Sequence, residues 1–181
     1  MRRGLVPLVA VLALAGCGGG NPLANPDDVA NPEQVEGRHL SFVYYQACVD
    51  MVLTTPQGTA TCAASGCHDS ATGTGGALRL AAGAATLDAS RPAAELRDSA
   101  MYRNFYSAQG MARIGDPAGS LLLAKPRLQN VLHGGGLVFS GESEATRRLA
   151  FWIARPMPTG QDEFSSAGNA LLGPGGECRT E

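Results

Sequence analysis

The sequence predicts a mostly α-helical, loop-rich fold the size of one ordinary domain. Glycine (24 residues) and proline (11 residues) together approach a fifth of the 181 residues, and both favour turns and loops. Several stretches carry apolar residues at the three- and four-residue steps of a helix that buries one face. We therefore expect short helices joined by long loops.

The N-terminus has the pattern of an export signal. A basic start at residues 1–4 is followed by an apolar run, residues 5–15, that is too short to span a bilayer. The run ends in Leu14-Ala15-Gly16-Cys17, which resembles the lipobox of bacterial lipoproteins and implies cleavage before Cys17 and acylation of that residue. We expect a signal peptide at residues 1–16, a lipidated tether at 17–37 and a lipid bilayer as a partner. Since Gly18 rather than aspartate follows Cys17, the favoured location is the outer membrane of the cell envelope, facing the periplasm.

The first predicted helix covers residues 38–53. Its apolar residues fall on one face at helical spacing: Phe42, Tyr45, Val49 and Val52. The sequence Thr54-Thr55-Pro56-Gln57-Gly58 ends it.

Three further helices are indicated by their capping residues. The second runs from Asp98 as N-cap to Gly110 as the stop. The third begins with Asp116 as the cap and ends before Pro126. The fourth begins near residues 140–143 and ends at Pro156. We expect the folded domain at residues 38–160, followed by a glycine-rich, weakly patterned tail at 161–181.

Cys62 and Cys67, followed directly by His68, form the arrangement that attaches haem c. Each thiol can add to a haem vinyl group, and the adjacent imidazole then binds the iron as an axial ligand. Four residues separate the cysteines instead of the usual two, which is a rarer variant of the motif. Two other interpretations stay open: a disulfide beside a bystander histidine, and a zinc site for which the motif supplies three of four ligands.

The second axial ligand has several candidates. His133 lies among glycines, which let backbone approach a flat ring closely, and it is the favoured distal ligand. Met157, between two prolines, is the alternative; Met111 and an open site are less favoured.

Two cysteines remain after lipidation and haem attachment, Cys48 and Cys178. Unmodified thiols tend to pair in the oxidising periplasm, so we expect a disulfide between them that fixes the tail to the first helix. The alternative is that Cys48 is a buried apolar residue.

The order of these elements resembles the single-haem c-type cytochrome domains of bacterial envelope proteins. The resemblance covers roughly residues 38–160 and rests on the cysteine–histidine motif, a glycine-rich stretch leading to Leu-x-Leu, and three later segments: Gly115-Asp116-Pro117, Ser120-Leu121-Leu122 and Trp152-Ile153. It implies short helices around one covalent haem c, with His68 and either His133 or Met157 on the iron.

The implied function is electron transfer by an envelope-anchored carrier rather than catalysis, with periplasmic or outer-membrane redox proteins as partners. The chain has no basic cluster, so the sequence predicts no nucleic-acid partner. The alternatives are a non-redox binding or scaffolding lipoprotein held together by disulfides and a zinc-binding lipoprotein.

Overall fold

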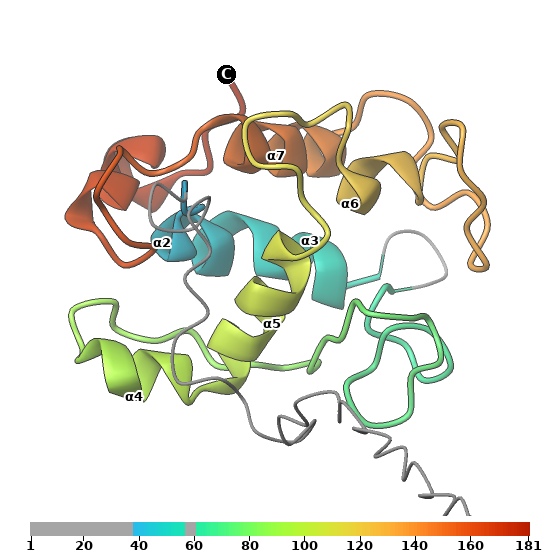
Figure 1. The fold of residues 1–181 in the computed structure, drawn as a ribbon, viewed down its shortest axis with the longest axis horizontal. Coiled ribbons are helices and arrows are strands. Elements are labelled where there is room, and N and C mark those ends of the chain that lie inside the picture. Colours follow the sequence, from blue (N-terminus) through green and yellow to red (C-terminus); the bar gives the residue numbers. More distant parts are fainter. Residues whose placement is uncertain (1–37, 57–60) are drawn as a thin grey trace, which may run out of the picture. The chain divides into compact units, whose positions relative to one another are not determined.

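The computed structural model describes residues 38–56 and 61–181 (Figure 1). The expected signal peptide, the tether and Cys17 lie outside these residues. Within the described part the chain forms short helices and loops without a β-strand, as the sequence predicts. No helix in this part is both long enough and apolar enough to cross a bilayer.

The first helix begins four residues later than predicted. Three consecutive pieces form it: α2 (Phe42–Tyr44), the π-helical η1 (Tyr45–Val49) and α3 (Asp50–Thr54). Ser41 starts it because its hydroxyl accepts a hydrogen bond from the Tyr44 amide at 3.1 Å. The predicted apolar face is confirmed: Phe42, Tyr45, Val49 and Val52 are all buried.

The second predicted helix is two helices. α4 (Ala93–Arg97) was not predicted, and Asp98 ends it instead of starting the next helix. The N-cap of α5 (Ala100–Gln109) is Ser99, whose hydroxyl accepts from the Tyr102 amide at 3.0 Å. Gly110 ends α5, as expected.

The third and fourth helices are also shorter than predicted. α6 (Leu121–Ala124) starts after Ser120, while Asp116 closes the preceding turn by accepting from the Gly119 amide at 2.9 Å. α7 (Glu144–Ala154) begins with a capping box in which Ser143 and Thr146 satisfy each other's backbone amides.

The core is built around the first helix, which packs against α5, α7 and η2 (Ser166–Leu171) (Figure 1). Edge-to-face aromatic contacts join these elements: Phe105 of α5 lies 5.5 Å from both Phe42 and Tyr45, measured between ring centroids. Trp152 of α7 is fully buried, and its indole donates to the Ser41 carbonyl at 3.0 Å. The helices that frame the molecule are therefore fixed by one aromatic core.

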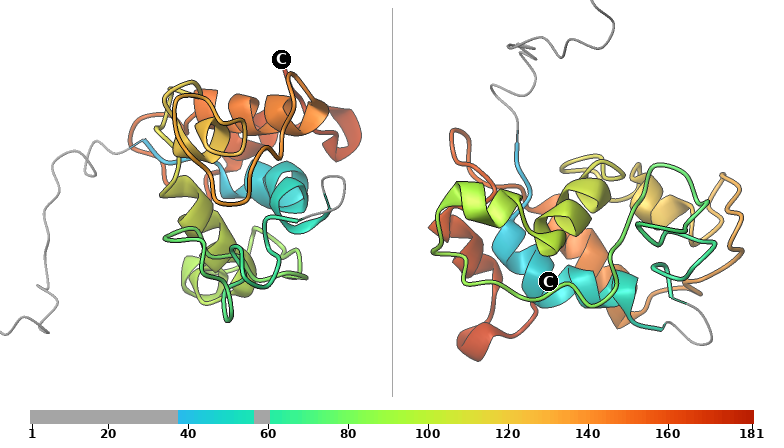
Figure 2. Two further views of the ribbon diagram at one scale, coloured as in Figure 1. Left: turned by 90° about the vertical axis from the view of Figure 1, so that its right-hand side faces the viewer. Right: turned by 90° about the horizontal axis from the view of Figure 1, so that it is seen from below.

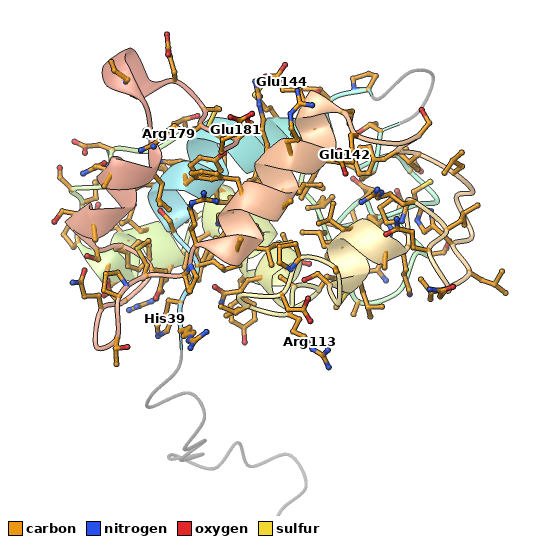
Figure 3. All side chains as sticks on the ribbon, turned by 90° about the horizontal axis from the view of Figure 1, so that it is seen from above. His39, Arg113, Glu142, Glu144, Arg179 and Glu181 are labelled. Atoms are coloured by element: carbon orange, nitrogen blue, oxygen red, sulfur yellow. A yellow bond between two sulfur atoms is a disulfide. The ribbon has the colours of Figure 1, made fainter. Side chains whose placement is uncertain are left out.

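The C-terminal tail packs on this core, although its sequence is weakly patterned. It contains two 3₁₀ turns, η2 and η3 (Pro174–Gly176), and its Phe164, Leu171 and Leu172 contact the core. Cys48 and Cys178 form the predicted disulfide, with Cα atoms 5.6 Å apart. Figure 3 shows Arg179 beside the first helix, where its carbonyl accepts a hydrogen bond from the Tyr44 hydroxyl.

Glu163 anchors the start of the tail. This carboxylate is 3 % exposed, and it accepts hydrogen bonds from Arg97 at 3.0 Å and from the Tyr102 hydroxyl at 2.9 Å. His39 lies 3.3 Å from its other oxygen. Burial opposes ionisation of Glu163, but the hydrogen bonds and the Arg97 charge outweigh it and lower the pKa.

Candidate functional site between His68 and His133

The segment from Cys62 to Leu80 folds into a compact loop that places His68 at its centre. The His68 amide donates to the Cys62 carbonyl at 3.0 Å, so the histidine folds back over the first cysteine. Its carbonyl accepts from the Leu80 amide at 2.7 Å, and Leu80 is fully buried. The glycine-rich stretch therefore returns to the histidine and is anchored in the core beside it.

The imidazole of His68 is held from behind. Its Nδ1 lies 3.2 Å from the Leu78 carbonyl. Gly75 packs against the same ring: a Cβ at this position would lie 2.7 Å from both Cε1 and Nδ1 of His68. Only a residue without a side chain fits here while the ring keeps its position.

His133 lies in the connection between α6 and α7 and is held in a similar way. Its Nδ1 lies 2.8 Å from the carbonyl of Gly136, and a Cβ on Gly135 would lie 3.0 Å from its Cε1. Figure 1 and Figure 2 show that this connection and the loop carrying His68 lie at the same end of the molecule.

The two imidazole rings lie close together and nearly parallel. Their centroids are 6.2 Å apart and their planes differ by 8°. A carbonyl oxygen can only accept, so each Nδ1 donates its proton and each Nε2 keeps a free lone pair. An imidazole nitrogen binds a transition metal at about 2.0 Å, with the ring centroid about 1.1 Å further back, so two imidazoles on opposite sides of one metal place their centroids about 6.2 Å apart. The observed separation equals that value.

A partly open cleft with a cavity volume of about 260 Å³ is lined by both histidines. Its walls are mainly apolar and include Leu53, Leu78, Met111, Leu121, Leu122 and Phe139. The combination of two imidazoles with apolar walls suits a large, flat, mostly apolar ligand that carries a metal.

Cys62 and Cys67 are free thiols. The structure therefore does not contain the alternative, a disulfide between Cys62 and Cys67. Cys62 lines the cleft, and burial raises the pKa of its thiol to about 11, so it is protonated at neutral pH. Cys67 is half-buried and does not line the cleft.

The electrostatics of the site keep His68 neutral. Burial lowers the pKa of His68 despite the opposing effect of the Leu78 carbonyl, and the nearby charges of His133, Arg79 and Lys125 lower it further. A neutral imidazole is the form that binds a metal, because its Nε2 lone pair is available.

The other candidate ligands lie elsewhere or at the margin. Met157 is buried and does not line the cleft; its amide donates to the His39 carbonyl. Met111 lines the cleft and is half-buried. Of the sequence-based candidates for the sixth ligand, the structure places His133 close to His68, with ring centroids 6.2 Å apart, and leaves Met157 away from the cleft.

Sequence reasoning missed three groups at this site. Gly75 packs against the His68 ring and Gly135 against the His133 ring. In the sequence, only the glycine-rich composition of these two segments indicated such close packing. Lys125 lines the cleft between the two histidine-bearing segments. A count would have singled it out, because it is the only lysine in the chain.

No three His, Cys, Asp or Glu side chains in the described part of the chain are grouped so as to hold a metal ion on their own. Comparison with known proteins adds no relative: no family model, no curated protein and no solved structure matches the chain.

Proposed function

We propose that this protein is an electron-transfer protein that carries one covalent haem c between His68 and His133. The observation that carries the proposal is the histidine pair, whose parallel rings stand 6.2 Å apart with both Nε2 atoms free. This centroid separation is the one that a metal ion bound to both Nε2 atoms would require. Haem iron at this position would supply a one-electron couple.

The cysteines supply the covalent attachment. In each addition the thiol S–H adds across a vinyl C=C bond: the sulfur bonds to one carbon, the proton goes to the other, and no net oxidation occurs. This reaction requires free thiols, and both cysteines are free. Cys62 already lines the cleft, whereas Cys67 has to turn toward it for the second bond.

The apolar walls suit the body of the macrocycle. Leu53, Leu78 and Phe139 would exclude water from its faces, which favours binding through burial of apolar surface. Each axial imidazole is oriented by a backbone carbonyl at Nδ1, which fixes its tautomer and supports its basicity as a ligand.

Exposed leucines beside the cleft support redox proteins as partners. Leu121 lines the cleft and is 44 % exposed, and Leu132 and Leu137, on either side of His133, are 91 % and 58 % exposed. Clustered exposed apolar side chains are typical of protein contact sites. With an acylated Cys17 as the anchor, the carrier would work at the periplasmic face of the cell envelope, in the outer membrane.

The test is expression of the full chain with a cytochrome c maturation system, followed by the intact mass and the absorption spectrum. The expected result is the mass of one added haem and a low-spin spectrum. The variant H133A should keep the covalent haem and lose the low-spin spectrum. The matched control is H39Q, since His39 contacts Glu163 at the tail rather than the cleft.

Each alternative gives a different result. A colourless protein whose Cys62 and Cys67 react fully with a thiol reagent without prior reduction, and which contains no metal, contradicts the haem proposal. A colourless protein with one bound zinc supports the zinc-binding lipoprotein. A haem protein whose spectrum is the same in H133A and in the wild type contradicts the role of His133.

A further inference from the structure

Lys125 is the only lysine among the 14 lysine and arginine residues of the chain. It is the C-cap residue of α6 and lies between the helix and the connection that carries His133. Its side chain lines the cleft, where it is the one residue with a permanent charge among otherwise apolar or neutral lining groups. A single cation therefore stands at a mainly apolar site.

The surroundings of Lys125 leave this charge uncompensated. Arg127, two residues along the chain, is paired, since it lies 3.7 Å from Glu142. Within residues 38–56 and 61–181, the half-buried Lys125 makes neither an ion pair nor a side-chain hydrogen bond. The charge of Lys125 also contributes to the lowered pKa of His68, which places the ammonium within electrostatic reach of the imidazole pair.

A partly buried ammonium beside apolar walls is costly unless an anion joins it. The cleft contains no carboxylate of the protein among its lining residues. The compensating anion is therefore expected on the ligand. A ligand that combines a metal and a flat apolar body with carboxylates at one edge satisfies the histidines, the walls and Lys125 together.

We propose that Lys125 binds a propionate carboxylate of the haem held between His68 and His133. This inference rests on the proposed function and adds an orientation to it: the propionate edge of the macrocycle faces α6. Lys125 is a positioning residue, because the iron ligands are other groups.

The uniqueness of Lys125 permits a direct chemical test. A water-soluble carbodiimide activates a carboxylate, and an amine in contact with it then forms an amide while the carbodiimide takes up the water as a urea. The full-length, haem-loaded protein is treated, digested and mapped by mass spectrometry. The expected product is the haem-bearing Cys62–His68 peptide joined to the Lys125 peptide, smaller by one water than the sum of the two.

Variants separate contact from mere proximity. K125M should give no such product. K125R should give no such product either, because a guanidinium does not form the amide under these conditions. K125R should nevertheless keep the ion pair, so its midpoint potential should stay near that of the wild type. K125M should shift the midpoint potential downward, since removal of a nearby cation favours the oxidised iron. The control R91Q removes an exposed charge just before α4, where Arg91 pairs with Glu95 of that helix. Figure 1 shows α4 at the opposite end of the fold from α6.

The outcomes distinguish this inference from the function on which it rests. Haem-loaded protein that gives no haem–Lys125 product, or that joins Lys125 only to protein carboxylates, overturns the inference and leaves the electron-transfer proposal standing. Protein that never acquires haem overturns both. A K125M potential equal to that of the wild type and of R91Q also contradicts the role of Lys125.

Discussion

Replacing Gly75 by alanine tests how closely His68 is held. The added Cβ would lie 2.6 Å from the Cys67 carbonyl oxygen and 2.7 Å from two atoms of the His68 ring. Ordinary contacts begin at 3.4 Å, so the ring has to move by about 0.7 Å (3.4 − 2.7) and the loop has to move away from the Cys67 carbonyl oxygen by about 0.8 Å (3.4 − 2.6). The Gly75 amide donates to that same carbonyl, so the added methyl group strains this hydrogen bond as well as displacing the His68 ring.

The expected cost of this overpacking is about 1–3 kcal/mol of unfolding free energy. Urea unfolding measures it through the fluorescence of Trp152, which is the only tryptophan and is fully buried. In the haem-loaded protein the displaced imidazole should weaken axial ligation and convert part of the low-spin spectrum to high-spin. Both effects come from the same displacement.

The matched control is Gly134→Ala. A Cβ there meets no atom within 4 Å, so G134A should lie within about 1 kcal/mol of the wild type, on the stabilising side. G135A, whose Cβ would lie 3.0 Å from His133, should be intermediate. If G75A and G134A unfold at the same urea concentration and have the same spectrum, the close packing of Gly75 on His68 is refuted.

Three further predictions concern the framework. The double variant C48S/C178S opens a link across 130 residues and should lose about 5 kcal/mol, seen as a lower urea midpoint; an unchanged midpoint would contradict the chain-entropy argument. The lowered pKa of Glu163 stabilises the fold at pH values above the ordinary value of 4.5, and this contribution is lost as the pH falls through the lower folded pKa. E163Q should therefore be less stable than the wild type at neutral pH and should approach it in acid; a constant difference would refute this linkage. N104A removes an amide side chain that hydrogen-bonds Asp50 at 2.8 Å and the backbone of Ala81 at 2.7 and 3.0 Å. This variant should lose about 2–4 kcal/mol of unfolding free energy, measured by thermal or urea unfolding. A loss below about 1 kcal/mol would contradict this prediction.

Local sequence signals predicted the helices because their causes are local. The apolar spacing from Phe42 to Val52 reappears as one buried face, and Gly110 and Pro156 limit their helices as expected. The starts were less accurate because several residues near each boundary can cap. Ser99 rather than Asp98 is the N-cap of α5, because Asp98 already belongs to the end of α4.

Features that depend on long-range contacts could not be predicted from the local sequence pattern. The tail shows no helical period, yet Phe164 packs on Phe42 with ring centroids 5.3 Å apart, and Glu163 is buried by partners more than sixty residues away. The π-helical turn at Tyr45–Val49 likewise has no local signature in its residue types.

The candidate site was predictable in its chemistry and only partly in its geometry. The spacing of Cys62, Cys67 and His68 identifies a motif by itself, because all three residues are neighbours in the chain. The position of His133 beside His68 depends on how the connection between α6 and α7 folds, so in the sequence Met157 stays as the alternative ligand and Met111 as a less favoured one. The structure separates them, because Met157 is fixed beside His39 and away from the cleft.

The most direct test of the account is the electron paramagnetic resonance and near-infrared magnetic circular dichroism of the oxidised, haem-loaded wild type. These spectra identify the two axial ligands of haem iron. We expect a low-spin iron with two imidazole ligands, from His68 and His133. A histidine–methionine signature, or high-spin iron with one histidine, would contradict ligation by the histidine pair.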